Sequence, residues 1–238
     1  MARTLTSFAL DESTPAGSAF AERQAEFEKW TRDDIGRELA ALRSALRTGR
    51  YPAGRPYRHV NGFTKVVAAE YPGGSRLTLH YWPQAAGAED DVSRPHDHRF
   101  PFSSHLLGGT QFFEELVETD TAADELWHRY VYRPYLRGRV ASVAGRGAVG
   151  LSRVKTVGRS PLAGTYNTDS ATVHRAVTGR QSACATLVLR GPRERRMSTV
   201  YYSPSESPPR GGLQFGRWLP APVVLEQVEH AIRMVAGT

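Results

Sequence analysis

The chain has 238 residues, of which 40% are hydrophobic, enough for one large domain with a sizeable core. No apolar run approaches the roughly 18 residues of a membrane span. The N-terminal stretch MARTLTSFALDESTPAGSAF lacks the apolar centre of a signal peptide. Cys184 is the single cysteine, which excludes a disulfide framework. Together these features predict a cytoplasmic protein that does not enter a membrane.

The formal net charge is +7, and a basic chain raises the question of nucleic-acid binding. Of the 31 basic residues only Lys29, Lys65 and Lys155 are lysines, and the arginines are spread along the whole chain rather than gathered in one groove. The densest basic run comprises Arg190, Arg193, Arg195 and Arg196. Such a run is either a solvated surface loop or a contact for phosphate or an acidic substrate. Nucleic acid is therefore not favoured as a partner.

The first 60 residues predict a disordered start followed by two helices. Residues 1–17 are rich in Ser, Thr, Pro and Gly, a composition typical of a disordered terminus. Helical periodicity follows in the segment 18–60, and Thr31 with two aspartates after it predicts the N-cap of the second helix. That helix carries an apolar stripe of Ile35, Leu39, Leu42 and Leu46. We expect this segment to pack on the outside of the domain that follows.

From residue 61 to 203 the pattern changes to short strands separated by turns that carry Gly or Pro. FTKVVAAEY and RLTLHYW are joined by PGGS, which predicts a hairpin. Further strands are expected in SSHLLGGTQFFEELVE, LWHRYVYRP, AVGLSRVKTV, VHRAV, CATLVLRGP and MSTVYYSP. Successive strands without intervening helices predict an all-β sandwich or barrel. The remaining segment, 204–238, is a Pro-rich connection followed by an amphipathic helix over residues 222–236.

His96 and His98 stand two residues apart in RPHDHRF, so on an extended strand their imidazoles point to the same face. The pair alone is a weak indication, because short histidine motifs occur by chance. Gly109 ends a turn eleven residues after His98, and His174 lies on a later strand, ATVHRAV. His-x-His, a Gly turn at this distance and a downstream His form the cupin pattern, and residues 61–203 resemble that family. The resemblance implies a double-stranded β-helix (jelly roll) with flanking helices and a metal bound by His96, His98 and His174.

Among cupins, the chain resembles the thiol dioxygenases, of the cysteine dioxygenase type. That branch carries aromatic-Thr-Arg, His-Asp-His and His-Arg-Val motifs. The corresponding residues here are Phe63-Thr64-Lys65, His96-Asp97-His98 and His174-Arg175-Ala176. The chain is also similar to uncharacterised bacterial cupins with HxW, HDHRF and GP near the ends of strands. Their counterparts are His80-Tyr81-Trp82, His96 to Phe100, and Gly191-Pro192.

Two departures limit what the resemblance implies. Most cupins place a ligand Glu four or five residues after the second His, but Phe102 and Ser103 stand there, which leaves three histidines without a carboxylate. Phe102 also cannot form the Cys–Tyr crosslink of animal thiol dioxygenases. The Ser-x-His-x-Tyr relay of that branch is replaced by Thr186, Val188 and Arg190. Oxidation of cysteine itself is therefore not implied.

The three-histidine set leaves the choice of metal open. Three neutral imidazoles leave vacant positions on an octahedral ion, where Fe(II) can bind substrate and dioxygen side by side. Zinc favours four-coordination and acts as a Lewis acid, and imidazole suits both metals. The resemblance favours Fe(II), with Zn, Ni and Mn as the alternatives.

The resemblance also indicates which residues bind the substrate. Lys65, in the place of the arginine that holds the substrate carboxylate, is either an anion anchor or a surface lysine. Arg190 is either a second anion contact or a surface residue at a strand end. Trp82 and Arg99 complete the set expected to contact the substrate. Ser104 is a weaker candidate for the same cavity.

His80 and Tyr166 are the expected catalytic side chains. His80 shares a strand face with Trp82, and it is either an acid–base group or a plain core histidine. The inward face of the strand that carries His105 is not fixed by the sequence. His59, His128 and His230 are expected on the surface. Cys184 lies in an apolar strand run and is expected to be structural.

Three functions stay open on the sequence. The first is an Fe(II)-dependent oxygenase that combines O2 with a small anionic substrate, such as an amino acid or its derivative. The second is a non-redox cupin, an isomerase, epimerase or lyase that uses Zn, Ni or Mn. The third is a non-enzymatic metal- or ligand-binding module. A homodimer is compatible with each.

Overall fold

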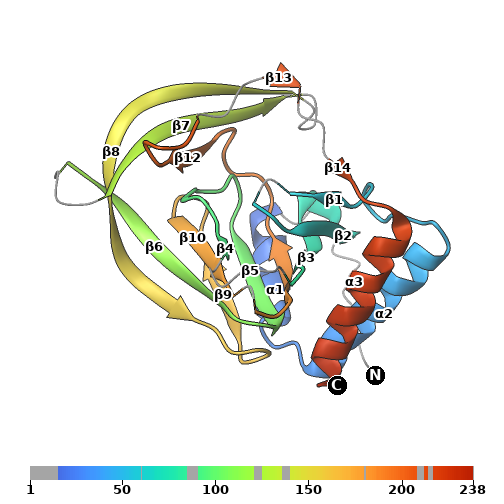
Figure 1. Ribbon diagram of the computed structural model, residues 1–238. Coiled ribbons are helices and arrows are strands. Elements are labelled where there is room, and N and C mark those ends of the chain that lie inside the picture. Colours follow the sequence, from blue (N-terminus) through green and yellow to red (C-terminus); the bar gives the residue numbers. More distant parts are fainter. Residues whose placement is uncertain are drawn as a thin grey trace.

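The computed structural model describes residues 16–59, 61–84, 91–120, 125–135, 140–179, 181–207, 212–213 and 217–237. Two antiparallel sheets form the body of the protein, and helices cover one of them (Figure 1). The helices are α1 (Ala16–Phe27), α2 (Arg32–Arg47), α3 (Ala221–Ala236) and the short 3-10 helix η2 (Pro72–Gly74). Most of the expected disordered segment 1–17 lies outside the described residues, and its last two residues begin α1. No helix in the described part of the chain has the length and apolar character needed to cross a membrane.

Each sheet contains strands from distant parts of the chain. The first sheet has the order β14-β1-β2-β3-β11-β5-β9. Its strands are β1 (Tyr57–Arg58), β2 (Thr64–Glu70), β3 (Arg76–Trp82), β5 (Phe102–Gly108), β9 (Thr165–Thr168), β11 (Cys184–Arg190) and β14 (Arg217–Trp218). The second sheet has the order β12-β7-β8-β6-β10-β4, and β13 pairs with β8. Its strands are β4 (Asp91–Val92), β6 (Gln111–Thr119), β7 (Glu125–Tyr135), β8 (Val140–Gly158), β10 (Val173–Thr178), β12 (Ser198–Tyr202) and β13 (Gly212–Leu213).

The chain crosses repeatedly between the two sheets. From β3 it passes to β4 in the second sheet, to β5 in the first, to β6, β7 and β8 in the second, and on through β9, β10, β11 and β12 in alternation. Strands that are neighbours in sequence therefore face each other across the interior, which is the connectivity of a jelly roll. The predicted fold class, an all-β jelly roll with flanking helices, is confirmed.

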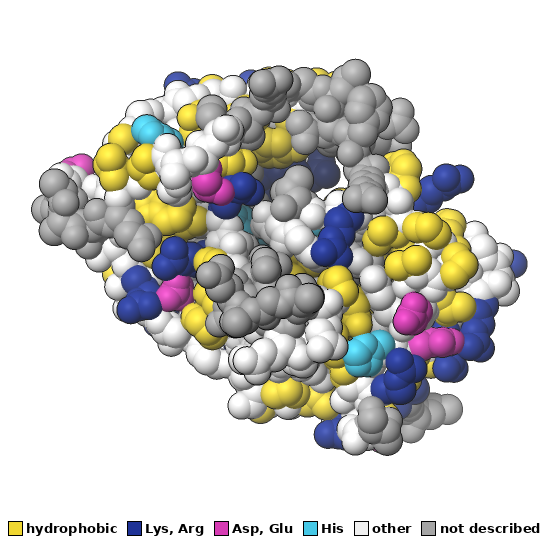
Figure 2. Space-filling model, in the orientation of Figure 1, with side chains coloured by type: hydrophobic (Ala, Val, Ile, Leu, Met, Phe, Trp, Pro, Cys, Tyr) yellow, Lys and Arg dark blue, Asp and Glu magenta, His cyan; other side chains and the backbone are white. Residues whose placement is uncertain are grey.

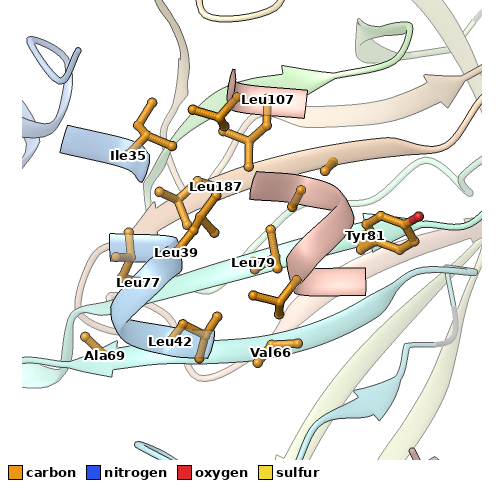
Figure 3. Packing of buried hydrophobic residues seen from close by; sticks show 14 of the residues in the cluster. Ile35, Leu39, Leu42, Val66, Ala69, Leu77, Leu79, Tyr81, Leu107 and Leu187 are labelled. Atoms are coloured by element: carbon orange, nitrogen blue, oxygen red, sulfur yellow. The ribbon is translucent and has the colours of Figure 1, made fainter. Parts of the chain in front are cut away.

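The main hydrophobic core lies between the helices and the outer face of the first sheet. Thr31 caps α2 in a capping box with Asp34, as the sequence predicts. The apolar stripe of α2 and that of α3 both face this sheet. Figure 3 shows Leu39 and Leu42 of α2 packed over Leu77 and Leu79 of β3. Fully burying each such side chain contributes about 1.5–3 kcal/mol, so this layer fixes the position of the sheet whose other face lines the interior.

The inner face of the first sheet carries polar side chains. Because successive residues of a strand point to opposite faces, the residues between the outward-facing leucines of β3 and β11 turn inward. On β3 these are Thr78, His80 and Trp82, and on β11 they are Thr186, Val188 and Arg190. Lys65 of β2 pairs with His80 and faces the same way. A sheet that is apolar outside and polar inside is the arrangement expected around a binding chamber.

Three elements differ from the sequence prediction. β9 was not predicted, because its four residues are too short to show an alternating pattern. β8 is much longer than AVGLSRVKTV, since its alternation is blurred by small and exposed residues. The His-Asp-His motif does not lie on a regular strand. It follows β4 as an extended segment in which His96 makes single bridges to His174 and Val200, and the flanking Pro95 and Pro101 cannot donate to a sheet ladder.

Cys184 is buried where the β5–β6 turn meets β11. Gly109 has a φ of 84°, and a Cβ there would lie 2.7 Å from the Cys184 Cα, so the turn requires glycine. The Cys184 side chain is fully buried, and burial raises the pKa of its thiol to about 12. We expect a thiol reagent to label Cys184 only after denaturant is added, and a folded Cys184→Ser protein to keep its turnover. Rapid labelling of the native protein, or loss of turnover in that variant, would contradict the structural role.

Candidate metal centre

The three histidines of the motif come together in the interior. The backbones of His96 and His174 are paired by two hydrogen bonds of 3.0 Å, each N–H donating to the carbonyl of the other residue. His98 lies two residues further on the same extended segment, and its Nε2 is 3.2 Å from Nε2 of His174. The ligand atoms of all three side chains lie within 4.8 Å of one another. The spacing of the motif therefore produces the expected convergence.

The geometry of the cluster fits a metal ion. The His96 Nδ1–H donates to the Arg94 carbonyl at 2.7 Å, which leaves Nε2 of that ring free as a ligand. Burial lowers the pKa of His96, and it lowers those of His98 and His174 well below the usual value, so the imidazoles are neutral. Metal–nitrogen bonds of about 2.0–2.1 Å place two neighbouring ligand nitrogens about 2.9–3.4 Å apart. The 3.2 Å between His98 and His174 lies within this interval.

Asp97, between the two histidines, points away from the cluster and holds the segment in place. Its side chain is 5% exposed and accepts the Thr199 backbone N–H at 2.6 Å. Arg195 donates to the other carboxylate oxygen at 2.8 Å and to the Ser170 carbonyl at 2.8 Å. The Asp97 carboxylate thus ties the ligand segment to β12 and to the loop before β10. Arg195, one of the arginines of the densest basic run, therefore anchors the segment that carries His96 and His98.

Removing this anchor is expected to loosen the site. Asp97→Ala should lower metal affinity by about 10–100-fold, the usual effect of losing a group that orients a ligand. Competition with a chromophoric chelator measures the affinity. Asp33→Ala, on the exposed first turn of α2, is the matched control and should bind as the wild type does. Equal affinity in a folded Asp97→Ala protein would show that the segment is held without this carboxylate.

An aromatic wall surrounds one side of the cluster. The rings of Phe102 and Phe113 lie 5.7 and 5.5 Å from that of His174, and Tyr166 stacks on Phe113 at 4.1 Å. Among the described residues, the ligating group contains three histidines and no carboxylate. Glu115 faces the same side as His174, because the two are register partners, but its carboxylate pairs with Lys155 at 3.5 Å. Burial and the Glu115 carboxylate raise the pKa of Tyr166.

The wall formed by β2, β3 and β11 of the first sheet is cationic. Burial, then Arg190, lowers the pKa of Lys65 to about 8, and Lys65 in turn lowers the pKa of His98. Arg190 is 8% exposed, and its guanidinium lies 4.7 Å over the ring of Phe100. Burial, then Arg76 and Arg193, lowers the pKa of Arg190 to about 10, and Arg99 adds to that shift. Lys65, Arg190 and the half-buried Arg99 therefore share one side of the chamber.

Two further histidines lie beside Lys65. Phe63 is sandwiched between the rings of His59 and His80, with centroids 4.4 and 4.3 Å away, and Trp82 closes the group at 4.9 Å from Phe63. Nε2 of His80 is buried and has no hydrogen-bond partner within the described residues. Burial and Lys65 lower the pKa of both rings, that of His59 to about 3. Both are therefore neutral side chains in the chamber wall.

The chamber contains open space. Lys65, His80, His96 and His98 keep part of their surface accessible although burial shifts the pKa of each. Side chains that are enclosed by the protein but still accessible to water line a cavity. In Figure 2 the protein is hollowed between the β7–β8–β12 side and the β1–β2 side, with Lys and Arg side chains along the walls.

The sequence prediction places some histidines incorrectly. His59 was expected on the surface, but it is enclosed next to Lys65 and its pKa also responds to His96. The strand that precedes it, β1, has two residues, too few to show which face is inward. His230 is half-buried, with its Nδ1 2.7 Å from the Tyr81 hydroxyl. His105 lies on the helix side of the first sheet, where its Nε2–H donates to the Phe27 carbonyl at 2.7 Å.

The remaining predicted residues divide between the chamber and its supports. Lys65, His80, Trp82 and Arg190 lie on the inner face of the first sheet, and Tyr166 lies against the aromatic wall. Ser104 is bound through its hydroxyl and carbonyl by Arg159, with 3.1 Å between Arg159 Nη1 and Ser104 Oγ, and so supports the wall. Glu115 was missed because its strand, QFFEELVE, carries polar residues on both faces.

Comparison with known proteins shows distant similarity only. No family model and no curated protein sequence matches the chain. An oxalate oxidase bound to the substrate analogue glycolate is 15% identical over 75% of each chain, with a TM-score of 0.33. The polyketide cyclase RemF from Streptomyces resistomycificus is 16% identical over 66% of this chain and 84% of its own, with a TM-score of 0.32. A DMSP lyase structure is 15% identical over 74% of this chain and 88% of its own, with a TM-score of 0.35. Similarities of this size carry no argument about the function of this chain.

Proposed function

We propose that the protein is a mononuclear non-haem Fe(II)-dependent oxygenase that acts on a small anionic substrate. The observation that supports it best is the convergence of His96, His98 and His174, without a carboxylate ligand, opposite an enclosed wall that carries Lys65 and Arg190. Neutral ligands leave the full charge of the ion available to the substrate. Iron bound by these three imidazoles would supply redox chemistry with dioxygen next to the bound substrate.

Lys65 and Arg190 bind and orient the substrate in this proposal. Lys65 supplies a compact positive charge, whereas the planar guanidinium of Arg190 binds a carboxylate through two parallel hydrogen bonds. Phe100 stacks under Arg190 and lies 5.4 Å from the His98 ring, so it spaces the anion contact from the metal ligands. Trp82 and Arg99 form the adjoining walls. The substrate is thereby held between the first sheet and the histidines.

His80 and Tyr166 exchange protons with the substrate. Nε2 of His80 is buried and unpartnered among the described residues, so it is available to a substrate group. The lowered pKa of His80 keeps it neutral, and a neutral imidazole accepts a proton. Tyr166 has a raised pKa and therefore stays protonated, so its hydroxyl donates. The two side chains serve as base and acid on different walls of the chamber.

The residues in place of the thiol dioxygenase relay argue for a different substrate. Thr186, Val188 and Arg190 stand on the inner face of β11, where that branch carries its Ser-x-His-x-Tyr relay. These three positions therefore face the chamber, but they carry a threonine, a valine and an arginine instead of the residues of the proton relay. This arrangement favours anion binding over the activation of a thiol, so cysteine is not the substrate that we propose.

A non-redox reaction is the second candidate, and His59 is the observation that favours it. His59 and His80 are two neutral bases on either side of Phe63, near a three-histidine set that also suits catalytic zinc. A lyase, isomerase or epimerase abstracts a proton next to a carboxylate, and these imidazoles would serve as its bases once a bound anion offsets the effect of Lys65 and raises their pKa. Zn, Ni or Mn would then act on the bound substrate as a Lewis acid.

Metal content and oxygen uptake distinguish these functions. The protein is purified anaerobically, its metals are measured, and Fe(II)- and Zn(II)-loaded samples are tested with a panel of small carboxylic acids. The proposal expects oxygen consumption with iron alone, and isotopically labelled dioxygen counts the oxygen atoms that enter the product. Turnover without oxygen in the zinc, nickel or manganese form would establish the second candidate. A protein that holds no metal under any condition would be a binding module.

A further inference from the structure

We propose that the chamber takes a substrate with two anionic groups, a small dicarboxylate or a molecule of the same charge, rather than a simple monoanion. This inference specifies the substrate class of the proposed function and rests on that function only for the role of the metal. It is carried by two enclosed cations that form no ion pair within the described residues, by their separation on the sheet, and by the charge of the rest of the chamber.

Lys65 and Arg190 have no ion-pair or hydrogen-bond partner in the part of the chain that the structure describes. Two neighbouring arginines, by contrast, are neutralised: Arg76 pairs with Glu70 at 2.7 Å and Arg195 with Asp97 at 2.8 Å. Arg190 is more than nine-tenths buried, and its guanidinium lies over the ring of Phe100. The Glu70 carboxylate favours the charged form of Arg190, but it is already paired with Arg76. An enclosed charge without a partner is unfavourable, and a bound anion removes that penalty.

The register of the first sheet places these cations in different rows. Lys65 is opposite His80, and His80 is opposite Thr186, so Lys65 belongs to the row of Thr186. Arg190 follows Thr186 by four residues on β11, a rise of about 13 Å along the strand. Both side chains are long and extend from the inner face of the first sheet. Anchor points in separate rows suit two anionic groups of one molecule better than one shared carboxylate.

The other charged groups of the chamber leave these two cations uncompensated. Glu115, the carboxylate that faces the aromatic wall, is already paired with Lys155. The metal ligands are neutral imidazoles and contribute no negative charge. Arg99 adds to the positive potential beside Arg190. A monoanion would leave one of the enclosed cations unpaired, whereas a dianion neutralises both.

Calorimetric titration of the purified full-length protein tests whether the chamber prefers dianions to monoanions. The probes are malonate, succinate and glutarate, with butyrate as the monoanion of the same carbon count as succinate, all at pH 7 and equal ionic strength. We expect at least one dicarboxylate to bind about tenfold to hundredfold more tightly than butyrate, the effect of one added charge-assisted hydrogen bond. We also expect one chain length to bind best. Equal affinities for butyrate and all three dicarboxylates would overturn the inference.

Variants identify the groups responsible for the preference. Arg190→Met and Lys65→Met should each reduce the preference for the dicarboxylate to less than about threefold, while the control Arg47→Met, a helix residue paired with Glu229, keeps it. A dianion preference that survives both chamber variants would assign it to other residues and refute the proposal. If a variant fails to fold, the comparison of butyrate with the dicarboxylates on the wild type still decides. Oxygen uptake and iron content test the proposed oxygenase activity separately. Tight binding of a dianion without oxygen consumption would refute the oxygenase activity and leave the preference for dianions standing.

Discussion

Replacing His174 by Ala is expected to lower the affinity for iron by more than about a hundredfold while the β-fold persists. Losing a group that merely orients a ligand costs about 10–100-fold, and His174 supplies one of three ligating nitrogens with no carboxylate nearby to replace it. Its side chain touches Phe102 and Phe113, but its backbone bonds to His96 do not depend on the imidazole. Metal analysis after dialysis against a weak chelator measures the loss.

His96→Ala and His98→Ala are expected to have effects of the same size, because the three rings enter the site equivalently. His128→Ala is the matched control, since His128 lies on β7, away from the motif, and should leave iron content unchanged. Circular dichroism of each variant reports whether the sheets persist. Iron at one equivalent in a folded His174→Ala protein would refute the three-histidine assignment and leave His96 and His98 as an incidental pair.

The sequence predicted well those strands that have a clear face. β3 is RLTLHYW without any change, and β11 begins at the expected Cys184, because alternating or continuous apolar runs between turn residues specify a strand. The orientation of the first sheet could not be predicted in the same way. Both of its faces are buried, one by helices and one by the second sheet, so hydrophobicity alone does not distinguish outside from chamber. For this reason the sequence did not show whether Lys65 and Arg190 face the chamber or the surface.

The convergence of the three histidines was predictable from the sequence, whereas their surroundings were not. The two-residue spacing indicates that His96 and His98 share a face, and the resemblance to the cupin pattern adds His174. His59 reaches the chamber through the pairing of β1 with β2, a contact that depends on the tertiary fold. The role of Asp97 as an anchor for Arg195 and β12 also depends on segments about a hundred residues away in sequence. Long-range pairing of this kind leaves no local pattern.

Lys65→Met is expected to reduce kcat/KM by about two to four orders of magnitude while iron content stays normal. Lys65 is enclosed and lies near His98, so its ammonium would pair with a substrate anion inside the chamber. Removing one partner of such a pair costs about 3–5 kcal/mol, because the other charge is left uncompensated, at about 1.4 kcal/mol per tenfold. Without substrate the same change removes an enclosed unpaired charge, so the variant should melt at a higher temperature than the wild type.

The pH dependence and the arginine variant separate anchoring from a surface role. Lys65 has a pKa of about 8, below its usual 10.5, so the charged form predominates below pH 8 and is lost as the pH rises through that value. Anion affinity of the wild type should therefore fall above about pH 8, and that fall should be absent in Lys65→Met, whose affinity is low throughout. Lys65→Arg should recover only part of the activity, since the planar guanidinium needs more room than an ammonium and stays charged. Its affinity should accordingly show no decline near pH 8. Wild-type kinetics in both variants would place Lys65 outside the site and remove the main support for an anionic substrate.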